Sequence, residues 1–219
     1  KKYTSIKEPF RSFGKSNLFT KYANYYFRNY SNSLVAQGYF SNLNRHLRRM
    51  NSRFIVSSYV SMILLTGVIG LIVSVITLII LLFFEVSFLA PFFILSEENI
   101  LIRFFKFIII VPLTPIVSML FFYFYPTSES KNLGNKIDQE LPFVTIHMSA
   151  IASSGIEPIG IFKIVLNSEE NKYTSIEFQK LMYLINFHGE DIVGALNKVS
   201  STSPSLKLKE LFNGLAVTI

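Results

Sequence analysis

The chain has 219 residues, half of them hydrophobic, with 22 Phe and 11 Tyr but no Trp and no Cys. The lack of cysteine excludes disulfide bonds and cysteine-ligated metal ions among these residues. The formal net charge of +7 is unevenly spread, with a net +10 in residues 1–53, −1 in residues 85–106 and −2 in residues 126–219. The length permits one or two domains, and the uneven charge separates a basic arm from the rest of the chain.

The basic arm, residues 1–53, begins with a predicted linker and then mixes aromatic with cationic side chains. Apolar residues recur at helical spacing, which predicts a juxtamembrane helix, at Leu18, Tyr22 and Tyr25 and again at Leu43 and Leu47. Basic residues interleaved with aromatic ones are also typical of nucleic-acid surfaces.

The arginines of the arm favour a membrane surface instead. Four of them cluster immediately before the apolar segment that follows, at Arg45, Arg48, Arg49 and Arg53. We therefore expect these cations to face anionic lipid head groups, at roughly 1 kcal/mol each near the surface. We expect membrane lipid, and no nucleic acid, as the partner of this arm.

Two long uncharged segments follow. Residues 54–84 are 31 consecutive positions without a charge or a His, whereas a membrane-spanning helix needs roughly 20 apolar residues. Residues 107–125 form a second run of 19 positions. Pro112 and Pro115 weaken this second run, and a buried helix of a soluble protein is its alternative. We expect a transmembrane hairpin over residues 54–125, with spans at about 54–84 and 107–125.

The charges that flank the two spans predict their orientation. Arginines precede the first span, and Lys131 and Lys136 follow the second, whereas the loop at residues 85–106 is net negative. The positive-inside rule therefore places both termini in the cytoplasm and the loop outside. A single Cys at Ser96 should then react with an impermeant maleimide, and one at Ser168 should not. The first run is too long and too deep in the chain to be a signal peptide.

From Pro126 onward the sequence is polar and charged, and short amphipathic helices are predicted in residues 126–219. Apolar residues recur every three or four positions and predict the first of these helices, at Ile137, Leu141, Val144, Met148 and Ile151. It should begin at about residues 139–141, because Pro142 is tolerated in the first turn of a helix. Gly155 should end this helix in a left-handed conformation, with Pro158 shortly beyond.

Four further helices are predicted by the same spacing, around Ile159, Phe162 and Leu166; around Phe178, Leu181 and Ile185, ended by Gly189; around Ile192, Ala195, Leu196 and Val199; and around Leu208, Phe212, Leu215 and Ile219. Each has one apolar stripe, so together they can close the core of an antiparallel bundle. No segment alternates with period two, so no sheet is expected. The predicted fold class is an all-α membrane protein, a transmembrane helix hairpin followed by a cytoplasmic helical bundle.

Two stretches of this C-terminal part, ELPFVTIHMSAIASSGIEP and HGEDIVGALNKVSSTSPSLKLKELFNGL, resemble the cytoplasmic domain of the type II secretion system F-domain family. These are inner-membrane platform proteins of type IV pili, type II secretion systems and archaella, and the YP, KID and ELPF sequence after the spans is most similar to the archaeal branch. The resemblance covers about 90 residues and rests on the order of several short elements: Leu141, Pro142, Gly155, Pro158, Gly189, Ala195, Leu196 and Pro204.

The resemblance implies a multi-pass cell-membrane protein without enzyme activity of its own. A family member would couple a hexameric secretion ATPase in the cytoplasm to the insertion of pilin-like subunits into a filament, and would act as a homo-oligomer. Family members carry a second F domain and more spans, so we expect this chain, which ends within the fifth predicted helix, to be part of a longer protein with an incomplete F domain. Four acids are candidate ATPase contacts, with a merely solvated face as the alternative: Asp138, Glu140, Glu190 and Asp191.

The residues themselves predict no catalytic, cofactor-binding or metal-binding site. The three histidines, His46, His147 and His188, are isolated from one another. HGED at 188–191 could form a metal or acid/base site, but two adjacent acids more often complement the dipole at the start of a helix. Neither a phosphate-binding loop nor a nucleophile elbow is found.

The main alternative is a transporter or channel subunit with a cytoplasmic helical regulatory domain, in which helix breaks at Gly67, Gly70, Pro112 and Pro115 surround a solute path. Spans without ionisable residues in their interior disfavour an ion or proton route. A membrane sensor with the bundle as its signalling output is a third possibility, although it lacks a recognisable phosphoacceptor site.

Overall fold

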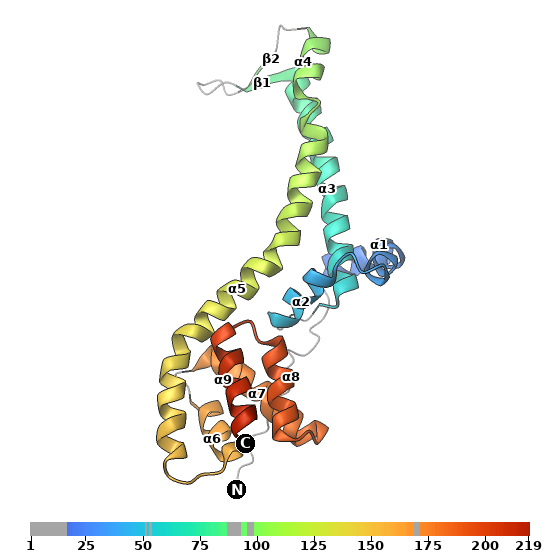
Figure 1. The fold of residues 1–219 in the computed structure, drawn as a ribbon. Coiled ribbons are helices and arrows are strands. Elements are labelled where there is room, and N and C mark those ends of the chain that lie inside the picture. The colour runs from blue at the N-terminus through green and yellow to red at the C-terminus, as the bar shows by residue number, and fades with distance from the viewer. Residues whose placement is uncertain (1–16, 51, 53, 87–92, 96–98, 169–170) are drawn as a thin grey trace. The chain divides into compact units, whose positions relative to one another are not determined.

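The computed structural model describes residues 17–50, 52, 54–86, 93–95, 99–168 and 171–219 (Figure 1). This part of the chain is predominantly helical, which confirms the expected all-α class. The helices are α1 (Leu18–Ala36), α2 (Ser41–Arg49), α3 (Val56–Phe83), α4 (Ile100–Phe107), α5 (Ile110–Ala152), α6 (Pro158–Leu166), α7 (Lys172–His188), α8 (Ile192–Thr202) and α9 (Leu206–Thr218).

Between α3 and α4, where the sequence predicted a loop and no sheet, lie two short strands, β1 (Phe84–Val86) and β2 (Phe93–Leu95), so that expectation is wrong here. They pair in antiparallel fashion, with Phe84 opposite Leu95 and Val86 opposite Phe93. The Arg103 side chain, 3% exposed, donates from its Nη2 to the Phe84 carbonyl over 3.1 Å, which ties α4 to the start of β1.

The chain divides into two compact units. One unit, here the apolar unit, contains residues 16–40 and 55–125. The other, here the bundle unit, contains residues 41–54 and 126–219 among others. The expected basic arm is thus divided, since α1 belongs to the apolar unit and α2 to the bundle unit.

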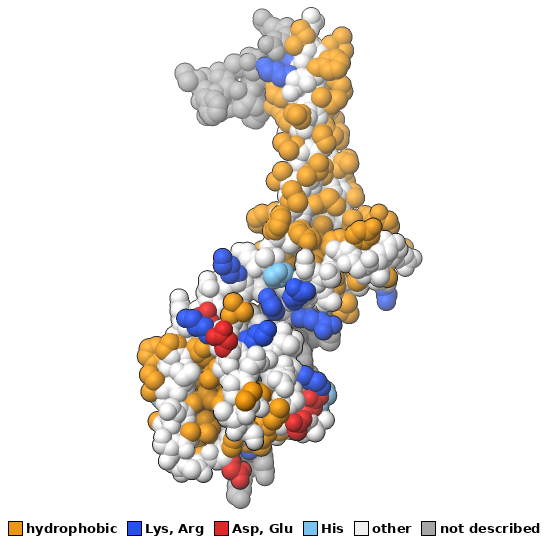
Figure 2. Space-filling model, in the orientation of Figure 1, with side chains coloured by type: hydrophobic (Ala, Val, Ile, Leu, Met, Phe, Trp, Pro, Cys, Tyr) orange, Lys and Arg blue, Asp and Glu red, His pale blue; other side chains and the backbone are white. Residues whose placement is uncertain are grey.

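Two helices of the structure are long and apolar enough to cross a membrane, Val56–Phe83 and the α4–α5 stretch Ile100–Ala152. In their most apolar windows only 28% and 0% of the residues are buried, and hydrophobic side chains cover much of the visible surface of these helices (Figure 2). The buried helix of a soluble protein would hide such residues in a core, so exposure on this scale disfavours that alternative.

Within the apolar unit, α3 runs antiparallel to the first part of α5. Tyr59 near the start of α3 contacts Phe122, while Ser74, four turns further along α3, contacts Val111 near the start of α5. Gly70 lies between these points, so close to α5 that a Cβ there would be 3.1 Å from the Cα of Pro115. Small residues let two helix backbones approach in this way, as they do in membrane helix pairs.

The predicted start of the first bundle helix at residues 139–141 is wrong, because α5 is continuous from Ile110 to Ala152 and passes through Pro126 and Pro142. One cause is that buried positions recur every three or four residues along a single side of this helix, both before and after the predicted start. These positions are Pro126, Ser130, Gly134, Ile137, Leu141, Val144 and Met148. A second cause is that the hydrogen bond lost at Pro126 is replaced by one from α3.

The bundle unit packs α5 with α6, α7, α8 and α9 around one hydrophobic core. Its centre is a chain of three aromatic rings from three helices, with 5.7 Å between the centroids of Phe162 and Phe178 and 5.2 Å between those of Phe178 and Phe212. The apolar stripes predicted for these helices form or border this core, except that Ile219, predicted to belong to the last stripe, is 51% exposed. The helix ends are also where the sequence predicted them, since Gly155 and Gly189 adopt φ angles of +74° and +66°.

The packing side of α1 differs from the prediction. Leu18, Tyr22 and Tyr25, expected to mark its apolar face, are 73%, 57% and 81% exposed. The residues buried in this helix are the small ones, Thr20, Ala23 and Ser31. Close packing against α3 selects small side chains, so a search for large apolar residues at helical spacing finds the opposite side of the helix.

Candidate functional site

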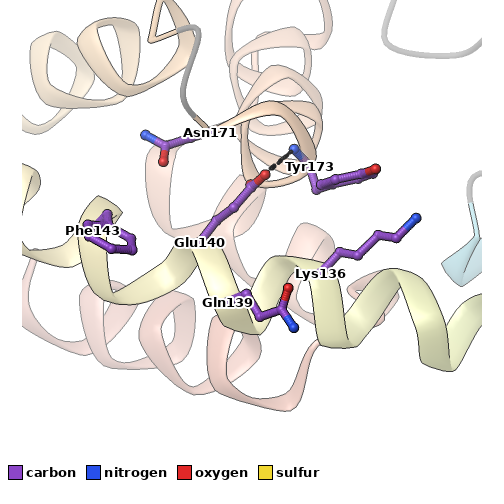
Figure 3. A pocket seen from close by; sticks show the side chains of 6 residues that line it. All are labelled: Lys136, Gln139, Glu140, Phe143, Asn171 and Tyr173. Atoms are coloured by element: carbon purple, nitrogen blue, oxygen red, sulfur yellow. Dashed lines mark hydrogen bonds between the residues drawn. The ribbon is translucent and has the colours of Figure 1, made fainter.

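The candidate site is the group of four acids at the helix ends of the bundle unit, beginning with Glu140. Its carboxylate accepts hydrogen bonds from the backbone N–H groups of Tyr173, over 3.0 and 3.1 Å, and Thr174, over 2.7 Å (Figure 3). These N–H groups belong to the first turn of α7, whose own N-cap residue, Asn171, provides no side-chain cap. A carboxylate from α5 therefore caps α7 and complements its dipole.

Asp138, half a turn before Glu140 on α5, contacts the N-cap of α9. Its Oδ1 accepts a hydrogen bond from the Ser205 hydroxyl, and the Ser205 Oγ in turn accepts from the backbone N–H of Leu208 over 3.0 Å. Ser205 is the N-cap of α9. Asp138 thereby orients the cap of a helix 67 residues away in the sequence.

Glu190 and Asp191 both serve α8. Asp191 is its N-cap and accepts a hydrogen bond from the backbone N–H of Gly194 over 3.2 Å. Glu190 forms an ion pair with Lys198, two turns further along. Asp191 is exposed and Glu190 is half-buried. The sequence predicted exposed acids; in the structure each of the four has an intramolecular partner, and Asp191 is the most accessible of them.

The residues that carry the family resemblance have structural roles in this bundle. Leu141, Ala195 and Leu196 are 6%, 0% and 0% exposed in the core. Pro158 occupies the first turn of α6, and Pro142 is exposed inside α5. Pro204 packs closely against Gly134 on α5. A Cβ at Gly134 would lie 2.7 Å from the Pro204 carbonyl oxygen, so this contact requires a glycine. Gly134 was not singled out from the sequence, and the only signal for it was its place on the buried stripe.

A shallow cavity of about 320 Å³ lies beside the Glu140 cap, lined by Lys136, Gln139, Glu140, Phe143, Asn171 and Tyr173 (Figure 3). The Lys136 ammonium lies 4.9 Å from the centroid of the Tyr173 ring, a cation–π contact. Phe143 and Ile146, one turn apart on α5, are each 66% exposed. This outer side of α5 combines accessible apolar side chains with a fixed polar edge, the composition of many protein-docking surfaces.

A second cavity, of about 360 Å³, lies within the bundle unit and is lined by Arg48, Ser52, Lys180, Tyr183, Leu184, Lys198, Val199 and Thr202. Two of its cations are in contact with acids: Lys198 with Glu190, and Lys180 with Glu177 over 2.8 Å. Burial raises the pKa of Glu177, and the neighbouring Lys180 opposes that rise. With two of three cations already paired, this cavity is a weaker candidate for an anion site than its lining suggests.

The arginine cluster lies on α2, apart from Arg53, which is outside the described residues. Leu43 and Leu47 are each 2% exposed, so α2 is anchored by its apolar side and keeps Arg45 and Arg48 exposed. Burial, together with the charges of Arg49 and Arg45, lowers the pKa of His46. The cations of this helix are therefore its arginines at neutral pH.

Among the residues that the structure describes, no three His, Asp or Glu side chains are grouped closely enough to hold a metal ion. Compared with protein-family models, with curated proteins and with solved structures, the chain gives no significant match.

Proposed function

We propose that this chain is the polytopic membrane platform of a type IV pilus-like or archaellum assembly machine. In this proposal α3 and the first part of α5 cross the cell membrane as a hairpin, and the helical bundle faces the cytoplasm. There the bundle meets a hexameric secretion ATPase, and the platform, as a homo-oligomer, passes the motion of that ATPase to pilin-like subunits. The platform itself hydrolyses nothing.

The observation that carries this proposal is the continuity of α5. Its first part supplies the apolar surface of a membrane-length helix, and its last part supplies Ile137, Leu141 and Val144 to the bundle core. A load applied to the bundle therefore reaches the apolar part of the chain through one helix, without an intervening loop. The sequence resemblance adds the kind of machine, since the residues that carry it are the ones that form and end the bundle helices.

The proposed orientation, with both termini in the cytoplasm, rests on the positive charge beside the spans. Because the chain contains no Cys, single-Cys variants report on it without background. Asn99→Cys, at the start of α4, should react with an impermeant maleimide in intact cells, and Ser153→Cys, at the end of α5, should react only after lysis. The reverse pattern would reject this topology.

Partner capture tests the function itself. A photo-crosslinker replacing Ser149, which is exposed on α5 one turn from Ile146, should trap a secretion ATPase or a pilin-like subunit from native membranes. The same group replacing Asn213, exposed on α9, is the matched control for nonspecific capture. If Ser149 instead traps a solute-binding protein, the transporter alternative is favoured; if it traps only lipid or the chain itself, the platform proposal fails.

The acids require a variant that separates charge from capping. Asn caps helices about as well as Asp does, so Asp191→Asn removes the charge and keeps the hydrogen bond to Gly194. If Asp191 contacts a basic surface of the ATPase, Asp191→Asn should weaken capture while thermal stability is unchanged. Equal capture by the variant and the original chain would remove Asp191 from the contact.

A further inference from the structure

The helix α1 crosses α3 steeply, close to the start of α3. Its hydrogen-bonded contacts run from Thr20, 3.4 Å from the Met62 sulfur, through Asn24, 3.3 Å from Ser58, to Ser31, 2.8 Å from Ser61. Along α1 these contacts cover about 16 Å, but along α3 they cover only about 6 Å, at 1.5 Å per residue. Two axes that share so short a segment of α3 lie at a large angle to each other.

If α3 spans the bilayer, which rests on the proposed function, a helix that crosses its first turns at a large angle lies along the membrane surface. Such a helix has one flank toward the hydrocarbon and one toward water, on either side of the face that contacts α3. The two flanks of α1 should therefore differ in composition.

The flanks do differ. At 100° per residue, Phe19, Tyr26 and Tyr30 lie on one flank of α1, and Lys21, Arg28 and Asn32 lie on the other. Tyr26 and Tyr30 are 69% and 60% exposed, and Lys21, Arg28 and Asn32 are exposed as well, so neither flank is covered by the protein. Tyrosine has an apolar ring and a polar tip, which suits the boundary between head groups and acyl chains.

The contacts with α3 also indicate which flank faces the hydrocarbon. Thr20 and Ser31, at opposite ends of the contact, meet Met62 and Ser61 at nearly the same height on α3. Asn24, turned toward the cationic flank, meets Ser58, one turn closer to the start of α3. The cationic flank therefore points away from the apolar length of α3, and the aromatic flank points toward it.

The distribution of tyrosine agrees with this direction. The apolar unit contains eight of the 11 tyrosines, and none of them lies between residues 60 and 122. They gather at one end of the α3–α5 pair, the end marked by the contact of Tyr59 with Phe122. There the ring of Phe40, after α1, lies 6.4 Å from that of Tyr123. This is the arrangement of an aromatic belt at one membrane surface.

We propose that α1 is an interfacial anchor helix that lies in the lipid head-group region, with Phe19, Tyr26 and Tyr30 turned toward the acyl chains and Lys21 and Arg28 toward the phosphates and water. The partner is a phospholipid surface. The tyrosines gathered at this end of the α3–α5 pair hold the cytoplasmic end of α3, which α1 contacts, at a fixed depth in the membrane.

Because the chain has no Trp, a single Trp reports the depth of any chosen position. Tyr26→Trp and Tyr30→Trp place the reporter on the aromatic flank, and Asn32→Trp places it on the cationic flank. The full chain is reconstituted into phospholipid vesicles that carry bromine at either a shallow or a deep acyl carbon. Leu71→Trp, on the exposed side of α3, tests whether α3 spans the bilayer.

Both aromatic-flank reporters should emit at shorter wavelength than Asn32→Trp and lose more emission to shallow than to deep bromines. Leu71→Trp should lose more emission to deep bromines. Equal quenching of the two flanks, or stronger quenching of Asn32→Trp, with Leu71→Trp quenched as expected, overturns the anchor while the spanning helix stands. If Leu71→Trp is not quenched either, the membrane proposal fails as well.

Discussion

The hydroxyl of Tyr59 donates a hydrogen bond to the backbone carbonyl oxygen of Phe122 over 2.9 Å. Phe122 precedes Pro126 by four residues, and proline has no N–H with which to complete the helical bond to that carbonyl. Tyr59 thus replaces the donor that Pro126 lacks. A buried acceptor left without a donor costs about 1–3 kcal/mol, so this contact explains how α5 continues through the proline.

Ser74 stands in the same relation to Pro115. Its hydroxyl lies 3.3 Å from the carbonyl oxygen of Val111, four residues before Pro115, but only 2.7 Å from the carbonyl oxygen of Leu71 in its own helix. One hydroxyl proton is thus divided between two acceptors. The replacement of the lost helical bond is weaker here than at Tyr59.

Tyr59→Phe should destabilise the folded chain by about 0.6 kcal/mol, the average for hydrogen bonds between membrane helices, and by at most about 1.7 kcal/mol. The measurement is unfolding by a denaturing detergent in mixed micelles. In a Pro126→Ala background the backbone N–H returns to residue 126, so Tyr59→Phe should cost much less there. An equal cost in both backgrounds would show that Tyr59 acts through packing instead of through this carbonyl. Ser74→Ala should cost less than Tyr59→Phe.

The same contact explains what the sequence could not predict. The stripe Ile137–Met148 and the turns at Gly155 and Gly189 depend on neighbours within a few residues, so periodicity and backbone chemistry predict them. The continuity of α5 through Pro126 depends on a hydroxyl that is 63 residues from Phe122 in the sequence.

The candidate site was partly hidden for a similar reason. Nothing near Glu140 in the sequence indicates that its carboxylate caps a helix that begins more than 30 residues later. The sequence therefore identified these acids as candidates but did not predict that they cap helices within the bundle. The packing side of α1 was not predicted for a different reason. It is formed by small and polar residues, Thr20, Ala23 and Ser31, and a pattern of hydropathy does not detect such a face.

The close approach of α3 to α5 predicts different tolerances at two glycines one turn apart. A Cβ at Gly70 would lie 2.8 Å from the Ser118 Oγ and 3.1 Å from the Cα of Pro115, whereas one at Gly67 would lie 2.8 Å from the flexible end of Met119. Backbone cannot move aside as a methionine side chain can. Gly70→Ala should therefore cost about 1–3 kcal/mol, and Gly67→Ala should cost clearly less.

The measurement for the glycines is again detergent unfolding, with both variants made in the same chain. Ala is intrinsically better than Gly in a helix by about 0.5–1 kcal/mol, a gain that both variants share and that does not affect their difference. Similar stabilities for the two variants would mean that the helices can separate at Gly70 without loss, so that the contact with Pro115 is not limiting.

The cap that Glu140 provides to α7 predicts a local effect on that helix. Glu140→Ala leaves the N–H groups of Tyr173 and Thr174 without their acceptor, and should cost about 1–2 kcal/mol. Compared with the original chain, the variant should show a larger increase in hydrogen exchange, measured by mass spectrometry, in the first turn of α7 than in α9. Gln139→Ala, its exposed neighbour on α5, is the control and should leave exchange unchanged. Uniformly faster exchange across the bundle would argue against a local cap.

The buried carboxyl of Glu177 predicts a pH dependence of stability. Glu177 is 1% exposed, and its Oε1 lies 2.8 Å from the Lys180 ammonium. Burial raises the pKa of this carboxyl above its ordinary value of 4.5, although Lys180 opposes the rise. A raised pKa means that the folded chain holds this proton more tightly than the unfolded chain does. Its contribution to stability is therefore present below pH 4.5 and declines as the pH rises through the folded-state pKa.

Glu177→Gln keeps the shape of the side chain, can still accept from Lys180, and cannot titrate. The free energy of unfolding of the original chain minus that of the variant should therefore fall as the pH rises from 4.5, and level off above the folded-state pKa. Glu210→Gln, at an exposed position of α9, should show no comparable fall. A difference that instead grows with pH would mean that the attraction of Lys180 outweighs burial and lowers the pKa of Glu177, making the pair a stabilising ion pair at neutral pH.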